Sequence, residues 1–207
     1  MKRFVTFLAA VLVGVAMFTP SAIAATQTRS GSGDQAVGPI RLSKGLAVIR
    51  MATGQTSSNY IVWLETSGGR KIELLANVVG SYNGSRAVRI PKTGKYYLNV
   101  TSDTNWRIVV SQSRPKTAPS TRTFRGTGPR ATSLFKLSRG SYTFSWSGRG
   151  DSNFIVWLLD KNGNRVDLVC NKIGATKGSK RVRITSTSQY IMDIDADAGW
   201  TIRAKRR

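Results

Sequence analysis

SNYIVWL at residues 58–64 recurs as SNFIVWL at residues 152–158, and these two heptapeptides decide the fold. A displacement of 94 positions aligns the chain with itself without a gap from Ser58 to Ile108, and 20 of the 51 aligned positions are identical. Repetition over this length indicates that one structural unit was duplicated. The positions shared by both copies are the ones that their common fold requires.

Within both copies the apolar residues recur at every second position. Tyr142, Phe144 and Trp146 alternate with Ser and Thr, and Val182 and Ile184 alternate with arginines. This period is that of half-buried β-strands, and turns rich in Gly and Asn separate the runs. No segment after the amino-terminal apolar run has the 3.6-residue period of a helix. The sequence therefore predicts an all-β protein of two tandem antiparallel β-sandwich domains, jelly-roll-like, with six to seven strands each.

Composition indicates where the domains begin and end. The amino terminus has the basic, apolar and small-residue regions of a signal peptide, so we expect cleavage after Ala24 and a secreted, periplasmic or cell-surface protein with no transmembrane segment in its mature form. Polar segments flank the repeats. The expected order is a signal peptide (1–24), a flexible leader (25–37), the first repeat (38–110), a basic Ser/Thr/Pro linker (111–128) and the second repeat with a basic tail (129–207).

Three strand patterns carry a family resemblance. Residues 153–160 read NFIVWLLD, residues 94–100 read GKYYLNV, and an earlier strand opens with Gly-x-Tyr at Gly140. This pattern resembles the secreted bacterial β-sandwich repeats of the prepeptidase C-terminal type, and the resemblance covers each copy. It implies a module that accompanies exported enzymes or surface proteins and that in some cases binds carbohydrate or protein. It supplies no fixed functional residue.

Catalytic and metal chemistry finds little support in the sequence. The chain contains no histidine, which removes the most common general base and zinc ligand. The acids of Asp193–Asp197 resemble the start of a calcium loop, but Ala198 stands at the sixth position, where such a loop needs glycine. The lone thiol, Cys170, aligns with Ala76 and is predicted to be a small buried side chain. We therefore expect no enzymatic activity, no metal and no cofactor.

The charge of the chain points to an anionic partner. With 32 Lys and Arg against 10 Asp and Glu the formal charge is +22, and removal of Lys2 and Arg3 with the signal peptide leaves +20. Such a surplus attracts polyanions, which outside the cytoplasm include cell-wall phosphate polymers, lipopolysaccharide and acidic polysaccharides. Nucleic acid is an incidental partner only, because no nucleic-acid-binding motif is present. The alternative, that the charge only maintains solubility, stays open.

Basic residues gather on the fifth strand expected in each repeat and near the carboxyl terminus. Strand alternation directs Arg89, Arg181 and Arg183 away from the apolar face. Guanidinium groups can bind phosphate or carboxylate through two parallel hydrogen bonds. The candidate polyanion-binding residues are Arg86, Arg89, Lys172, Lys177, Lys180, Arg181, Arg183, Arg203 and Lys205.

Trp63 and Trp157 are equivalent, and each lies on the side of its strand opposite Tyr60 or Phe154. In one interpretation both indoles emerge on the outer face, where a flat ring can stack on a sugar or on another protein. In the other, which we favour, the strand is buried on both sides, for example at the contact between the repeats. The first interpretation makes the protein a carbohydrate-binding or protein-interaction tandem, with another envelope protein as a further class of partner.

Overall fold

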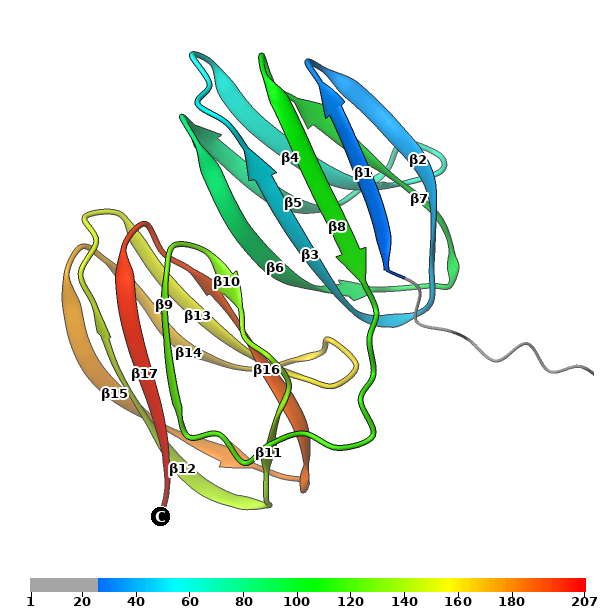
Figure 1. Ribbon diagram of the computed structural model, residues 1–207. Coiled ribbons are helices and arrows are strands. Elements are labelled where there is room, and N and C mark those ends of the chain that lie inside the picture. Colours follow the sequence, from blue (N-terminus) through cyan, green and yellow to red (C-terminus); the bar gives the residue numbers. More distant parts are fainter. Residues whose placement is uncertain (1–25) are drawn as a thin grey trace, which may run out of the picture.

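The computed structural model describes residues 26–207, and the predicted signal peptide lies outside these residues (Figure 1). All regular elements of this part of the chain are β-strands. Every strand pairing among them is antiparallel. The predicted class, an all-β protein of two tandem antiparallel sandwiches, is confirmed.

Eight strands form the first repeat. They are β1 (Gln27–Ser32), β2 (Gln35–Leu42), β3 (Gly45–Thr53), β4 (Asn59–Thr66), β5 (Lys71–Val79), β6 (Tyr82–Ile90), β7 (Gly94–Thr101) and β8 (Asn105–Ser111). Two four-stranded sheets have the orders β1-β8-β3-β6 and β2-β7-β4-β5. Most successive strands therefore alternate between the two sheets, which is the arrangement of a jelly roll.

The second repeat repeats this plan. Its strands are β9 (Thr123–Thr127), β10 (Arg130–Ala131), β11 (Phe135–Leu137), β12 (Gly140–Gly148), β13 (Asn153–Asp160), β14 (Arg165–Ile173), β15 (Thr176–Ile184), β16 (Ser188–Asp195) and β17 (Gly199–Arg206). One sheet has the order β15-β12-β17-β9 and the other β10-β16-β13-β14, with β11 also paired to β16. Thus β9 corresponds to β1, and β10 and β11 together correspond to β2.

Two segments that the sequence predicts to be irregular contain strands. The expected leader, 25–37, holds β1 and the start of β2, and the expected linker, 111–128, holds β9. β1 pairs with β8 along its whole length, and β9 pairs with β17. Both lie at sheet edges and have no fully buried side chain, so their backbone hydrogen bonds leave no apolar pattern in the sequence. These strands raise each repeat above the predicted six to seven.

Each repeat has its own hydrophobic core between its two sheets. In the first repeat Tyr60 and Leu64 of β4 face Ile49 and Ile108 of the opposite sheet, and all four are fully buried. A third, smaller cluster lies between the repeats, as described next. The two cores are separate, so each half can bury its apolar side chains by itself.

The repeats meet through one face of each. Leu46 and Ala87, on the outer side of β3 and β6, form a buried cluster with Leu159 and Ile191, on the outer side of β13 and β16. The middle of Figure 1 shows β6 of the first repeat beside β10 and β16 of the second. This contact, called the junction below, occupies one outer face of each sandwich and leaves the other sheet of the second repeat, β15-β12-β17-β9, uncovered by the first.

Candidate anion-binding face

Strand β15 presents two arginines to solvent. Val182 and Ile184 are buried in the core of the second repeat, so the alternation of the strand turns Arg181 and Arg183 to the outer side, where both are exposed. Lys177 lies four residues before Arg181, on the same side of the strand, and is also exposed. Three cations therefore follow one outer edge of the sheet.

Strand β17 presents a second set. Ile202 and Ala204 are buried in the same core, whereas Arg203 and Lys205 are exposed on the outer side. The sheet order places β15 and β17 on opposite sides of β12, although they are far apart in the chain. The fold thus brings the carboxyl-terminal cations beside those of β15.

Hydroxyl side chains of β12 fill the space between these two strands. Thr143 stands opposite both Arg181 and Lys205 in the pairing register, and Ser145 stands opposite Arg203. Ser141, Thr143, Ser145 and Ser147 lie on the outer side because Tyr142 and Phe144, between them, are fully buried. Each hydroxyl can donate a hydrogen bond to an anionic oxygen.

We call this surface the basic face. It comprises Arg125 of β9, Ser141, Thr143, Ser145 and Ser147 of β12, Lys177, Arg181 and Arg183 of β15, Arg203 and Lys205 of β17, and Arg207. None of its four strands contains Asp or Glu. Strands in a sheet are about 4.8 Å apart and every second residue of a strand is about 7 Å along, so cations flank β12 in two rows about 10 Å apart. Such spacing suits an extended polymer with repeated negative charges.

The cations of the basic face have no acidic partners. The ion pairs of the described residues are Arg86 with Asp193 and Lys180 with Asp167, and neither involves the basic face. Arg207 crosses to β12, where its Nε donates to Thr143 Oγ1 at 2.8 Å. Without acids to neutralise them, these groups together produce a positive potential over one side of the second repeat.

Sequence reasoning found five members of this face and missed the others. Lys177, Arg181, Arg183, Arg203 and Lys205 were predicted and come together on it. Arg125 was missed because its segment was assigned to the linker, and Arg207 was counted only with the basic tail. The hydroxyl row was visible as the polar half of the β12 alternation, but only the sheet order shows that cations flank it.

Two predicted residues lie elsewhere in the second repeat. Lys180 lies on the same side of β15 as the buried Val182, so its side chain turns away from the basic face. It reaches across the edge between the sheets, where its Nζ donates to Asp167 Oδ1 at 2.6 Å and to Leu168 O at 2.8 Å. Lys172 is exposed on β14, which belongs to the opposite sheet. Neither contributes to the basic face, because a side chain in a strand can reach only the surface to which its alternation turns it.

Arg86, predicted as a polyanion-binding residue, lies instead in the junction. Its Nη2 lies 2.9 Å from Asp193 Oδ2, and its side chain is 18% exposed against 7% for Asp193. Burial disfavours its charge, but the adjoining carboxylate raises the pKa of Arg86 above its usual value. Arg89 is exposed beside the same junction, in the first repeat, and is likewise separate from the basic face.

The equivalent tryptophans have different surroundings. Trp157 packs against the apolar cluster of the junction, and Arg165 lies over its ring with the guanidinium carbon 4.4 Å from the centroid. Trp63 is half-buried on the outer side of β4, where Lys71 Nζ lies 4.5 Å from its centroid. Burial at the contact between the repeats therefore applies to Trp157, and the two indoles do not form a matched pair of exposed platforms.

The acids near the carboxyl terminus also have structural partners. Asp193, on the outer side of β16, is buried at the junction because the first repeat covers that side of the strand. Asp197 Oδ2 accepts hydrogen bonds from the amides of Asp151 and Ser152, both at 2.9 Å. Among the described residues no three His, Cys, Asp or Glu side chains gather as a metal site. The same residues include no helix of the length and apolarity that a membrane span needs.

Comparison with known proteins identifies no family for the chain. No protein-family profile matches it, and no curated protein matches it. Among solved structures, the PBSX exported protein XepA is similar at 9% identity over 87% of this chain and 85% of its own, with a TM-score of 0.31. A putative secreted protein from Parabacteroides distasonis is similar at 8% identity over 88% and 89%, with a TM-score of 0.24. Oxalate decarboxylase is similar at 8% identity over 87% and 75%, with a TM-score of 0.19.

Proposed function

We propose that this chain is an exported, non-enzymatic protein that binds an anionic polymer of the envelope or extracellular space through the basic face. The observation that carries the proposal is a sheet surface with two rows of cations, a row of hydroxyls between them and no carboxylate. Guanidinium groups bind phosphate and carboxylate bidentately, and hydroxyls add hydrogen bonds to the same oxygens. Cell-wall phosphate polymers, lipopolysaccharide and acidic polysaccharides all present such groups in series.

The contrast between the repeats supports a specific role for this surface. Ala47 pairs with Val88 as Tyr142 pairs with Val182, so Leu46 and Val48 correspond to Ser141 and Thr143. The first pair belongs to the apolar junction, whereas the second pair lies on the basic face. Cationic and hydroxyl side chains are therefore not a general property of this module. They stand on the one copy of the face that remains uncovered.

The proposed location outside the cytoplasm rests on the sequence of the amino terminus, which precedes residues 26–207. The amino-terminal pattern of basic, apolar and small residues supports export, and it directs the basic face to polyanions outside the cytoplasm. Membership of the prepeptidase C-terminal type of repeat is likewise part of the proposal, since it rests on strand sequences alone. Nucleic acid would be bound only through charge and would not be the specific partner.

Charge reversal on the basic face tests the proposal. The variant Arg181→Glu/Arg183→Glu/Arg203→Glu is compared with Lys92→Glu/Lys95→Glu/Arg107→Glu, which reverses three exposed cations of the first repeat and changes the net charge equally. Each exposed ion pair contributes up to about 1 kcal/mol, so we expect affinity for an immobilised phosphate polymer, lipopolysaccharide or acidic polysaccharide to fall at least ~10-fold in the first variant. The second variant should elute at nearly the salt concentration of the wild type.

Salt dependence separates this function from stacking on an aromatic ring. Binding by the basic face should weaken steeply between low and high ionic strength, because exposed charges are screened. Binding by the half-buried Trp63 would persist in high salt and be lost in Trp63→Ala. Equal losses in both charge-reversal variants would show that only net charge matters, and would refute a specific role for the basic face.

A further inference from the structure

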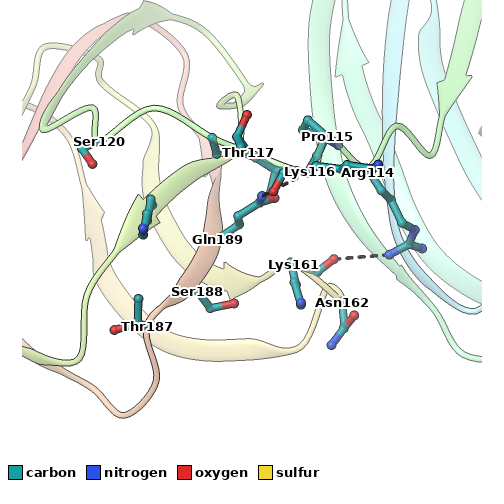
Figure 2. Close-up of a pocket in the computed structure, with 13 residues that line it drawn as sticks. Arg114, Pro115, Lys116, Thr117, Ser120, Lys161, Asn162, Thr187, Ser188 and Gln189 are labelled. Carbon is teal, nitrogen blue, oxygen red and sulfur yellow. Dashed lines mark hydrogen bonds between the residues drawn. The ribbon is translucent and has the colours of Figure 1, made fainter.

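A cavity lies beneath the connection between the repeats, on the side of the second repeat away from the basic face strands β15 and β17. It has a volume of about 750 Å³, within the range of small-ligand sites. Figure 2 shows its two walls: residues 114–120 of the connection on one side, and the β13–β14 turn with the start of β16 on the other. This site contains none of the residues of the basic face.

The charge of the cavity has one sign. Arg114, Lys116, Lys136 and Lys161 line it, and no Asp or Glu does. The Arg114 guanidinium donates to the carbonyls of Lys44 and Lys161, at 3.2 and 3.4 Å, and so has no carboxylate partner. No hydrogen bond or ion pair involves the three lysine ammonium groups within the described residues. These three groups are therefore available to a bound anion.

A neighbouring cavity at the junction provides a comparison. It has a volume of about 600 Å³ and is also lined by basic residues, among them Arg89 and Arg165. Its lining includes Glu73 and Asp193, whose carboxylates oppose an anion. The cavity under the connection has no such opposition.

The remaining lining selects the kind of anion. Thr117, Ser120, Asn162, Thr187 and Ser188 offer hydroxyl and amide groups to hydrogen-bond with ligand hydroxyls, and Leu134 adds an apolar contact. No aromatic side chain lines the cavity, so a nucleobase would find no ring on which to stack. Hydroxyl partners, an apolar part of the wall that includes Leu134, and a local excess of positive charge together fit a sugar that carries one anionic group.

The cavity walls are fixed before a ligand arrives. Gln189 Nε2 donates to the carbonyls of Pro115 and Lys116, at 3.0 and 3.1 Å, and the Lys136 amide donates to Pro119 O at 2.9 Å. The dashed lines of Figure 2 include the bond between Arg114 and Lys161 that closes the opposite end. A connection held at several points loses little further freedom on binding, which favours affinity.

We infer that this cavity binds a single monosaccharide unit bearing one carboxylate or phosphate group. The inference goes beyond polymer binding by the basic face and stands or fails independently of it. A free sugar acid, a sugar phosphate or an end unit of an acidic polysaccharide would all present the required chemistry.

Calorimetric titration of the full chain tests the inference. The probes are glucuronate and glucose 6-phosphate, with glucose and inorganic phosphate as controls. We expect saturable binding of at least one anionic sugar, identifying whether carboxylate or phosphate is preferred, and at least ~10-fold weaker binding of glucose and of inorganic phosphate. The variant Lys136→Glu/Lys161→Glu should lose this binding, whereas the basic-face variant Arg181→Glu/Arg183→Glu/Arg203→Glu should retain it.

The matched control is Lys92→Glu/Lys95→Glu, which reverses two exposed cations that do not line the cavity. Thermal unfolding monitored by circular dichroism establishes that all variants are folded. Absence of saturable binding by both anionic sugars would overturn the inference, as would undiminished binding by Lys136→Glu/Lys161→Glu. Equal affinity for glucose would refute the anionic requirement, and equal affinity for inorganic phosphate would refute the sugar requirement. Failure of the protein to retain a polymer, with sugar binding intact, would instead refute only the function proposed for the basic face.

Discussion

At the scale of single residues, one carboxylate in each repeat ties two turns together. Asp103 Oδ2 accepts hydrogen bonds from the amides of Ser57 and Ser58, and Asp197 Oδ2 does the same with Asp151 and Ser152. The Ser57 hydroxyl contributes most to lowering the pKa of Asp103. Burial opposes the charge of Asp197, but the two amides outweigh it, so its pKa is also lowered.

These lowered pKa values predict a dependence of stability on pH. Because the folded carboxyl has a lower pKa than the unfolded one, each aspartate stabilises the fold above about pH 4, and this contribution is lost as the pH falls through the folded pKa. We expect Asp197→Asn to lower the melting temperature by ~2–4 °C at pH 7, with the difference vanishing near pH 2. Circular dichroism melts across this range measure it. Asp151→Asn, at an exposed side chain, is the control, and a difference that persists undiminished at pH 2 would contradict the assignment.

Cys170 is a structural residue rather than a reactive one. Its side chain is 3% exposed, comparable to the 5% of the aligned Ala76. Burial raises the pKa of the Cys170 thiol to about 11, against a smaller opposing effect of Lys172. The thiol is therefore protonated at neutral pH and shielded from reagents.

Alkylation checks this conclusion. We expect iodoacetamide at pH 8 to leave the native protein unmodified over the time in which it modifies the guanidinium-unfolded chain completely, as followed by mass spectrometry. Cys170→Ala should fold with a stability loss of about 1–2 kcal/mol, because the first repeat accommodates alanine at this position. Rapid labelling of the native protein would show that the thiol is accessible.

At the scale of elements, the junction protects an exposed sheet edge. β6 is an edge strand, and the outward amides of such strands invite pairing with other chains. The Ala87 amide donates to Asp193 Oδ1 at 2.8 Å, and the Ser85 amide donates to Pro129 O at 3.1 Å. One carboxylate and one carbonyl of the second repeat thus accept hydrogen bonds from two edge amides of the first.

Removal of that carboxylate is predicted to be costly. Asp193→Ala leaves the Arg86 guanidinium and the Ala87 amide buried without a partner, and breaking a buried pair costs about 3 kcal/mol. Asp167→Ala breaks the more exposed pair with Lys180, which contributes less than about 1 kcal/mol. Urea denaturation compares the two variants with the wild type. Similar losses in both would show that the junction pair contributes no more than a surface pair.

The extent to which sequence predicts these elements depends on their burial. Strands such as β12 and β15 were predicted because one side of each is apolar, and the same alternation placed Arg181 and Arg183 outward. β1 and β9 were missed because edge strands are held by backbone hydrogen bonds that any polar sequence can form. The adjacency of β17 to β12 follows from long-range pairing, so the basic face as a unit could not be derived from local patterns. The same holds for Arg86, whose partner lies in the other repeat.

At the scale of the whole molecule, the duplicated sandwiches use corresponding faces differently. The outer side of β3 and β6 contacts the second repeat, whereas the corresponding side of β12 and β15 is free and basic. Likewise β13 and β16 are covered, whereas β4 and β7 keep Trp63 on an uncovered side. The sequence predicted two copies, but it could not predict which faces would meet, because both copies carry outward-facing residues of mixed character.

This unequal use has a consequence for assembly. The outer side of β3 and β6 in the first repeat contacts the outer side of β13 and β16 in the second. A head-to-tail contact between two unlike surfaces can in principle recur without end and build a filament. On the second module Arg181 replaces Ala87 and Ser141 replaces Leu46, so a third sandwich would have to desolvate guanidinium groups where the existing contact buries methyl groups. We therefore expect no third module to dock on this side, which leaves these guanidinium and hydroxyl groups facing outward.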